Sequence, residues 1–213
     1  MDKNEIAIFW FRRDLRLHDN CGLYQALQSG YKVLPIFIFD EEILNDLPKN
    51  DARVSFIYET LDAISIELLK IGCAVKIEKG TVLEVWKTLL ENYTIKEVYI
   101  NKDYEPYAIK REAKLKSFLN ENGVAFKSFK DQVIFEEAEI VKNDGLPYTV
   151  FTPYKNKWLQ KYHNVTIQKF PSETLIANFL KAAFTFPNLS DIGFVESSMK
   201  VKPINDSCIS NYV

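Results

Sequence analysis

Two stretches of the sequence carry the kinds of side chain that bind a small molecule. The first is the charged loop 12–19, in which three arginines alternate with two aspartates (Arg12, Arg13, Asp14, Arg16 and Asp19). Guanidinium groups can hold an anionic ligand or an adjoining domain. The same charges can also pair with one another at the surface, and the residues alone leave both interpretations open.

The second stretch is Asp-Tyr-Glu-Pro-Tyr at residues 103–107. Its two carboxylates are separated by one residue and can accept hydrogen bonds from the N–H or hydroxyl groups of a ligand, while Pro106 fixes the turn. Asp103 or Glu105 can equally cap the helix that follows. Binding and capping both remain open at this point.

Motifs that would indicate a phosphate site, a metal or a nucleophile are missing. Between Met1 and Gly22 the sequence has no glycine, so the first strand is not followed by a glycine-rich phosphate loop. His18 and His163 are the only histidines, and neither has a second histidine or a cysteine at metal-ligand spacing. No G-x-S-x-G turn is present. We therefore predict no catalytic residue and no metal site in this chain.

The elements that must position these residues follow from the apolar pattern. Asn20 is a good N-cap for a helix that ends near Gly30. Apolar runs without polar alternation predict strands buried on both faces, and strands that alternate with helices indicate a parallel sheet. We expect an α/β fold with strands at residues 6–11, 32–39, 73–77, 97–100 and 124–129, and further helices at 51–69, 82–92 and 107–122.

Near-helical spacing predicts the buried face of helix 51–69. The apolar residues at that spacing are Phe56, Leu61, Ile64, Leu68 and Leu69. Such a stripe is expected to pack on the sheet.

The pattern changes after Asp131, where prolines separate short pieces. We predict a short helix at residues 174–183 and an irregular, mostly polar tail at 188–213. A tail of this kind normally packs against another surface.

Three aromatic residues recur at every fourth position between lysines: Tyr154, Trp158 and Tyr162 alternate with Lys155, Lys157 and Lys161. Such a stripe can stack on nucleic acid. At helical spacing it more often packs against the protein itself, and we favour packing.

Composition narrows the class of protein. Of 213 residues 47% are hydrophobic, which is enough for a full core, and the net charge of −2 gives no global attraction to nucleic acid. Cys21, Cys73 and Cys208 form no C-x-x-C pair, as is usual in a reducing compartment. The opening M-D-K-N-E has no apolar run of signal-peptide length, and nowhere are there 18 consecutive apolar residues. We expect a cytoplasmic protein with no membrane partner.

Three segments, taken in order, resemble one known family. Residues 10–20 match W-F-R-x-D-L-R-x-x-D-N at every fixed position, and N-K-D-Y-E-P-Y-A-I-K-R-E (101–112) and V-F-T-P-Y-K-N-K-W-L (150–159) follow. They are similar to the DNA photolyase/cryptochrome family. The resemblance implies a Rossmann-like five-stranded sheet in the order 3-2-1-4-5. It also implies an antenna-chromophore domain at residues 1–165 and a linker at 166–213 that leads to a helical FAD domain outside this sequence.

The resemblance further implies a function. In the family, FAD in the helical domain donates an electron to a pyrimidine dimer flipped out of DNA, and an antenna pigment in the α/β domain passes excitation to that FAD. The full enzyme is a carbon–carbon lyase whose partners are damaged DNA and the helical domain in cis. This chain alone is expected to be inactive. A cryptochrome-type light receptor, a nucleotide-binding module without photochemistry and an interaction module with an empty pocket remain alternatives.

The resemblance also bears on the pigment. Tyr107 and Ala108 stand where folate-binding members carry an Asn-Glu pair, so a deazaflavin or flavin is favoured over methenyl-folate. The residues expected to line the pigment pocket lie at or near strand ends: Trp10, Arg12, Phe37, Asp40, Arg53, Asp103 and Glu105.

Overall fold

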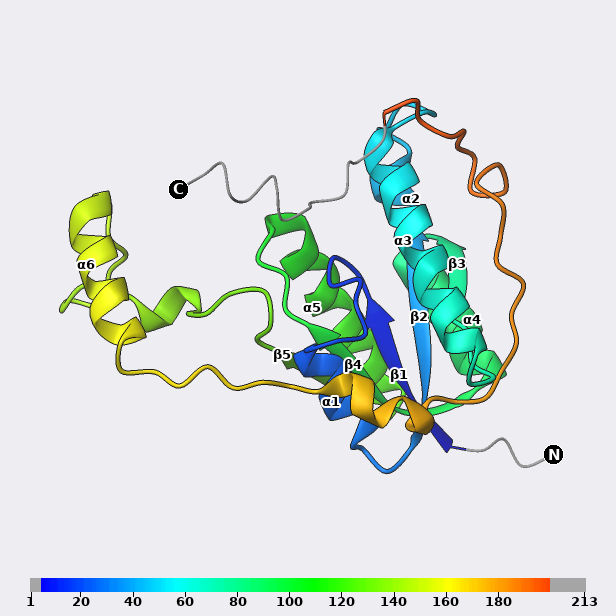
Figure 1. The fold of residues 1–213 in the computed structure, drawn as a ribbon, viewed down its shortest axis with the longest axis horizontal. Helices are drawn as coiled ribbons and strands as arrows, with labels where there is room; N and C mark the ends of the chain where they lie inside the picture. The colour runs from blue at the N-terminus through cyan, green and yellow to red at the C-terminus, as the bar shows by residue number, and fades with distance from the viewer. Residues whose placement is uncertain (1–4, 200–213) are drawn as a thin grey trace.

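The fold is an open parallel sheet covered by helices on both faces (Figure 1). The structure is a computed structural model that describes residues 5–199. The strands are β1 (Glu5–Phe11), β2 (Lys32–Asp40), β3 (Lys76–Gly80), β4 (Thr94–Asn101) and β5 (Ala125–Phe129). Every pairing between them is parallel and their order is β3-β2-β1-β4-β5. The expected fold class and strand order are confirmed.

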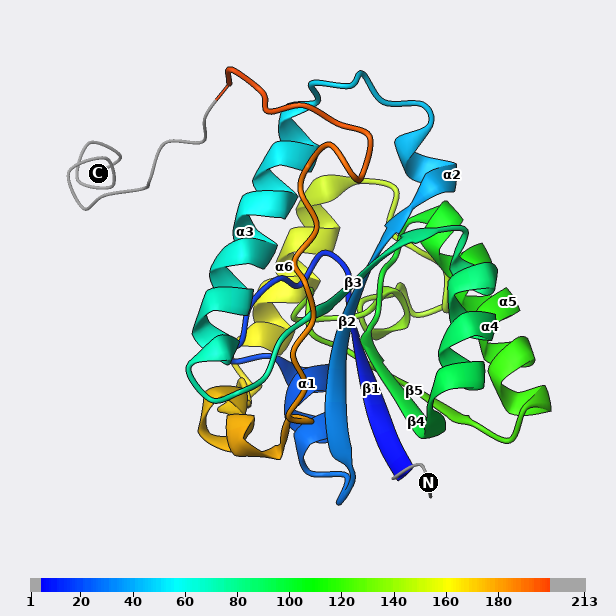
Figure 2. The same cartoon turned by 90° about the vertical axis from the view of Figure 1, so that its right-hand side faces the viewer.

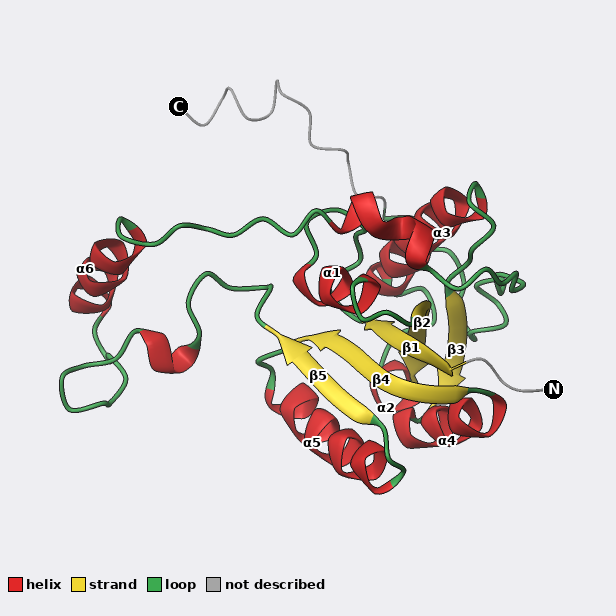
Figure 3. Ribbon diagram, turned by 90° about the horizontal axis from the view of Figure 1, so that it is seen from below, coloured by secondary structure: helices red, strands yellow, loops and turns green. Residues whose placement is uncertain are grey.

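Helices cover the two faces of the sheet in pairs. On one face lie α1 (Cys21–Leu27) and α3 (Ala52–Leu69), and on the other lie α4 (Val82–Asn92) and α5 (Pro106–Glu121) (Figure 3). A short helix, α2 (Glu41–Leu44), follows β2 directly and was not predicted. None of the helices in the described part of the chain is both long enough and apolar enough to cross a bilayer.

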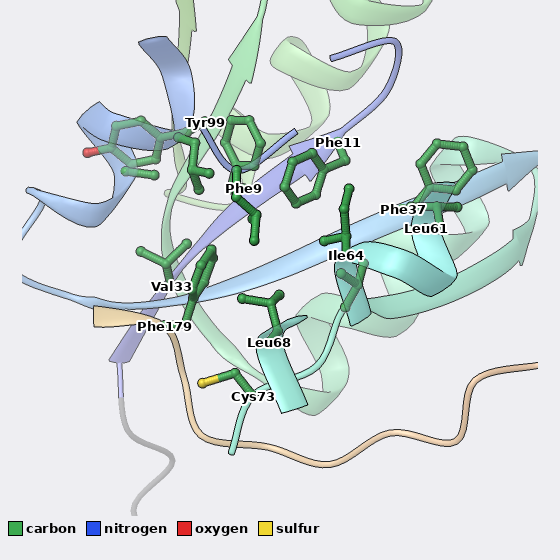
Figure 4. Packing of buried hydrophobic residues seen from close by; sticks show 14 of the residues in the cluster. Phe9, Phe11, Val33, Phe37, Leu61, Ile64, Leu68, Cys73, Tyr99 and Phe179 are labelled. Atoms are coloured by element: carbon green, nitrogen blue, oxygen red, sulfur yellow. The ribbon is translucent and has the colours of Figure 1, made fainter. Parts of the chain in front are cut away.

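The core has two halves because side chains of β1 alternate between the faces. Phe9 and Phe11 pack with Leu61 and Leu68 on the α1/α3 side (Figure 4). Trp10 packs on the opposite side, where its ring meets that of Trp86 with centroids 6.0 Å apart. Both faces are therefore apolar, as the absence of polar alternation predicted.

The expectations for the start of β3 and for the buried face of α3 were wrong. The third strand begins at Lys76, which pairs with Ile36, and not at Cys73. Cys73, Ala74 and Val75, in the connection between α3 and β3, are buried without pairing to β2, so an apolar pattern typical of a strand does not mark one here. Phe56 and Leu69, expected on the buried face of α3, are 48% and 55% exposed. Each follows a buried residue directly, and one position along a helix turns the side chain by about 100°.

The C-terminal segment packs along the α/β body. A 3-10 helix (Ser172–Asn178) stands in place of the predicted helix at 174–183. Residues 179–197, here called the strap, then run beside α3 (Figure 2). Phe179 is fully buried and bridges Val33 of β2, and the N–H of Val195 donates to the Lys49 carbonyl at 2.8 Å. The irregular tail predicted for 188–213 thus packs on this domain as far as Ser197, whose N–H donates to Oγ of Ser55 at 3.0 Å. The part of the tail beyond residue 199, with Cys208, lies outside the described residues.

Helix α6 (Phe151–Tyr162) stands apart from the sheet (Figures 1 and 3). Its Trp158 meets Phe135 of the preceding segment and Tyr162 of its own helix, with ring centroids 5.4 and 5.0 Å apart. No residue of the helix is buried. The aromatic stripe therefore packs on its own helix and on the segment before it, while the helix itself lies away from the sheet.

Candidate functional site

A pocket of about 340 Å³ opens over the carboxyl ends of β1 and β2. We call it the rim pocket. Its volume lies in the range of about 300–1,000 Å³ typical of small-molecule sites. One wall is apolar and comes from β1, β2, α2, α3 and the turn between these helices: Phe11, Phe37, Phe39, Leu44, Leu47, Val54 and Ile57. The opposite side is polar and comes from the end of β1, the loop after β4 and the first turns of α5.

The structure brings all the predicted site residues to this pocket: Trp10, Arg12, Phe37, Asp40, Arg53, Asp103 and Glu105. The reason is topological, because parallel strands bring their carboxyl ends to one edge of the sheet. The residues nevertheless differ in what they can offer a ligand.

Trp10 is held between two cations. The guanidinium carbons of Arg12 and Arg111 lie 5.4 and 5.0 Å from its ring centroid, within the range of a cation–π contact. The side chain is only 1% exposed. Trp10 therefore stiffens the floor of the pocket and presents little surface to a ligand.

Asp40 is occupied by partners of its own. Its Oδ2 accepts from the Tyr107 hydroxyl at 2.7 Å and pairs with Nη1 of Arg111 at 3.0 Å. Its Oδ1 accepts from the N–H of Glu42 at 3.2 Å, which caps α2. Burial and the Asp40 carboxylate raise the pKa of Tyr107, so the phenol stays protonated and donates. Asp40 thus positions Tyr107 and Arg111 in the wall.

Arg12 is also satisfied inside the protein. Its guanidinium pairs with Glu112 of α5 and donates to the carbonyl of Asn101. Arg16, farther along the same loop, pairs with Asp131 at 2.7 Å. The arginines of the loop, Arg13 included, therefore have carboxylate partners on other segments, and no ion pair joins them to Asp14 or Asp19 of the loop itself.

The loop after β4 is fixed at the mouth of the pocket. Asp103 accepts from the N–H of Glu105 at 3.1 Å and is 10% exposed. Glu105 occupies the N-cap position of α5, but its side chain makes no capping bond and is 67% exposed. Arg13 lies 3.7 Å from Asp103 and 3.6 Å from Glu105. Asp103 therefore organises the loop, while Glu105 faces the solvent.

Arg53 stands on the other side of the mouth. Its guanidinium pairs with Asp51, the N-cap of α3, at 2.7 Å, and its side chain is 72% exposed. These contacts lower the pKa of Asp51 to about 2, since the arginine stabilises the charged carboxylate.

The sequence prediction missed several lining residues, of which Arg111 and Tyr107 matter most. They lie four positions apart on α5 and so point from the same face of the helix. That spacing was visible in the sequence. The apolar residues of α2 were not visible in this way, because that helix was not predicted.

A flat aromatic group with a polar edge fits this pocket. The apolar wall suits a ring, and the charged groups gather on the opposite side.

Gly22, the first glycine of the chain, serves packing and not phosphate binding. A Cβ there would lie 2.7 Å from Oδ1 of Asn101.

An open parallel sheet with a pocket over its strand ends defines a Rossmann-like ligand-binding domain. The family model for DNA photolyase matches residues 7–174 of this chain. Since this is most of the chain, the protein belongs to the DNA photolyase family.

Similar proteins agree with this assignment. A deoxyribodipyrimidine photo-lyase of Synechococcus is 28% identical over 88% of this chain and 40% of its own length. A class III photolyase of Agrobacterium tumefaciens superposes with a TM-score of 0.71 at 25% identity, over 92% of this chain and 39% of that structure.

A third similar protein is an archaeal photolyase of Sulfolobus tokodaii, described with two FAD molecules and the implication of a novel light-harvesting cofactor. It superposes with a TM-score of 0.63 at 27% identity, over 82% of this chain and 41% of its own. The chain thus spans about 40% of the length of these photolyases.

Proposed function

We propose that this chain is the light-harvesting domain of a deoxyribodipyrimidine photolyase. Its rim pocket holds an antenna pigment, which passes excitation to FAD in a helical domain of the same enzyme. The observation that carries this proposal is the rim pocket itself, with an apolar wall on one side and a few fixed polar groups on the other.

The residues of the pocket suit a role in positioning. Trp10, Asp40 and Arg12 are each held by protein partners, so none is left to attack a bond or to move a proton. Excitation transfer requires a chromophore at a fixed distance and angle and needs no acid, base or nucleophile. A rigid wall at the edge of a sheet meets that requirement.

The wall also favours a deazaflavin or flavin over methenyl-folate. The Tyr107 hydroxyl is bound to Asp40, and Ala108 is 3% exposed. Neither offers the amide and carboxylate with which the family holds folate at these positions. The second FAD described for the Sulfolobus tokodaii photolyase supports a flavin-type pigment by analogy.

The substrate of the whole enzyme is DNA that contains pyrimidine dimers. Because this chain carries a net charge of −2, we assign most of the DNA contact to the helical domain. We assign residues 166–213 to the link with that domain, and the protein to the cytoplasm. This chain alone is expected not to split dimers in light, and repair by the purified chain would contradict that expectation.

The test is the absorption spectrum of the purified chain before and after incubation with a flavin or deazaflavin. We expect a band at wavelengths longer than those absorbed by tryptophan, retained through gel filtration. Ile57→Glu places a charge in the apolar wall and should abolish retention. Ile66→Glu makes the same change at a position of α3 that is 53% exposed and should retain pigment fully.

Two outcomes would contradict the proposal. One is the absence of a retained band with either pigment. The other is equal retention by the Ile57 and Ile66 variants, which would move the pigment away from the rim pocket.

A further inference from the structure

Residues 132–169, which we call the arm, leave the sheet after β5, carry α6 and return to the α/β body just before the 3-10 helix Ser172–Asn178. Figure 3 shows the arm reaching away from the sheet between these two points. The residues that flank it, Asp131 and Phe170, are far apart in sequence. Both nevertheless bind the same short stretch of chain after β1, residues 16–21.

The first end of the arm is held by the Asp131 carboxylate. Its Oδ2 lies 2.7 Å from Nη2 of Arg16, and its Oδ1 accepts from the N–H of Cys21 at 2.9 Å. The Asp131 side chain is 4% exposed, while that of Arg16 is 42% exposed. Because the carboxylate is buried with two donors, this contact holds the chain more firmly than an ion pair between two exposed side chains.

The second end of the arm is held by Asp19 and Ser172. The N–H of Phe170 donates to Oδ1 of Asp19 at 2.8 Å. Oγ of Ser172, a fully buried residue, accepts from the N–H of Asn20 at 3.1 Å and donates to the Leu17 carbonyl at 2.6 Å. These bonds fix the chain at the far end of the arm to the loop after β1.

Arg16 and Asp19 connect the two ends directly. The same Nη2 of Arg16 that pairs with Asp131 donates to the Asp19 carbonyl at 2.8 Å. Among residues 5–199, Asp19 is the one non-glycine residue with a positive φ, of 46°. In this uncommon backbone conformation its carbonyl accepts from Arg16 and its carboxylate accepts from Phe170. A continuous path of hydrogen bonds thus runs from Asp131 through Arg16 and Asp19 to Phe170.

A further contact ties the arm to the α/β body between its two ends. Glu136 accepts from Nζ of Lys102 at 2.8 Å and from the Tyr104 hydroxyl at 3.3 Å. These partners belong to the loop after β4 and not to the loop after β1. The contact can hold the beginning of the arm, but it does not join the two ends.

We propose that residues 16–21 form a clamp that couples the two ends of the arm, so that the arm and its helix α6 move on the α/β body as one unit. Release of the chain at Asp131 therefore loosens it at Phe170, because the path between them is a contiguous hydrogen-bond network. The clamp gives the charged loop after β1 a conformational role that does not depend on a ligand in the rim pocket.

Hydrogen exchange of the purified chain, followed by NMR, tests the clamp. Asp131→Ala removes the carboxylate at the first end of the arm. We expect exchange of the Phe170 amide, at the second end, to become about tenfold faster, the effect of losing about one net hydrogen bond. Amides of β1 and β2 should exchange as in the unsubstituted protein.

Arg16→Gln is a second variant for the same test. It is needed because Asp131→Ala also removes the acceptor of the Cys21 N–H and can disturb α1. Glutamine at position 16 keeps a partly exposed polar side chain and removes the ion pair with Asp131. It should likewise speed exchange at Phe170.

Two further variants are matched controls. Asp144→Ala removes the bond from the Leu146 N–H to a carboxylate within the arm itself. Lys96→Gln removes an ion pair with Glu5 at 2.8 Å from a side chain that is 40% exposed, much as Arg16 is. Neither residue belongs to the path, so exchange at Phe170 should not change.

Three results would overturn the inference. One is unchanged exchange at Phe170 in both Asp131→Ala and Arg16→Gln, and another is an equal rise in the control variants. The third is a rise of the same size throughout the sheet, since the arm would then not open separately from the α/β body. None of these results bears on pigment binding in the rim pocket.

Discussion

Asn101 joins three elements through one amide. Its Oδ1 accepts from the N–H of Gly22 in α1 at 2.7 Å, and its Nδ2 donates to Asn20 and Asp14 at 2.8 and 2.5 Å. Asn101 is 4% exposed, so these groups have little access to water. A buried hydrogen-bond network centred on Asn101 therefore holds the loop after β1 against β4 and α1.

Asn101→Ala should lower the free energy of unfolding by about 2–4 kcal/mol, because buried donors and acceptors lose their partners. Urea denaturation measures the change. Asn92→Ala is the control. The Asn92 side chain is exposed on α4 and donates to the Thr88 carbonyl of the same helix. Equal losses in the two variants would contradict a special role for Asn101.

Asp103→Ala should release pigment from the rim pocket without unfolding the domain. The variant loses the bond to the N–H of Glu105 that fixes the loop at the mouth. Pigment per protein, from absorbance after gel filtration, and the melting temperature measure the two effects. Asp144→Ala removes the equivalent bond to Leu146 in a distant loop and should retain pigment. Full retention of pigment by the Asp103 variant would show that this carboxylate is not needed for pigment binding.

At the scale of elements, most of the sheet was predictable, and the exceptions have physical causes. β1 and α4 matched their apolar patterns because their buried residues contact the sheet core directly. β3 began later than predicted, since only hydrogen bonding to β2 defines it. The site residues at strand ends followed from topology. The position of Arg111 could not be predicted from topology, because its place in the pocket wall depends on how α5 is rotated about its axis.

The cap of α3 gives a prediction for acid titration. Asp51 has its pKa lowered to about 2 by Arg53, so it contributes stability above its ordinary value of 3.8, and that contribution is lost as pH falls from 3.8 to about 2. Arg53→Gln should bring the pKa of Asp51 back toward 3.8, measured by NMR of the carboxyl carbon. The pKa of Glu139, which is also about 2, should be unchanged in the same spectra. If the pKa of Asp51 does not change in this variant, its hydrogen bonds with backbone N–H groups alone lower that pKa.

At the scale of the whole molecule, the strap makes residues far apart in sequence share one core. Phe179, Ile192 and Phe194 are buried with the α1/α3 half of the core. The sequence indicated that this region packs against another surface. Its polar, proline-rich character could not indicate which surface that is. The α/β body is thus completed by residues beyond 165.

Phe179→Ala should destabilise the domain by about 3–5 kcal/mol, the usual cost of removing a buried aromatic ring. The reason is that Phe179 is fully buried, in contact with β2. Thermal or urea unfolding measures the loss. Phe151→Ala, at a position that is 73% exposed on α6, should change stability by less than about 0.5 kcal/mol. A similar small change for Phe179 would mean that the strap is not part of the core.

The bridge between Val33 and Phe179 has a consequence for biosynthesis. Its two partners are separated by most of the chain, so a ribosome releases the second long after the first. Until residues 179–197 emerge, the nascent α/β body leaves exposed the part of the α1/α3 half of the core that Phe179, Ile192 and Phe194 cover. During that interval this part of the core is open to chaperones and to misassembly.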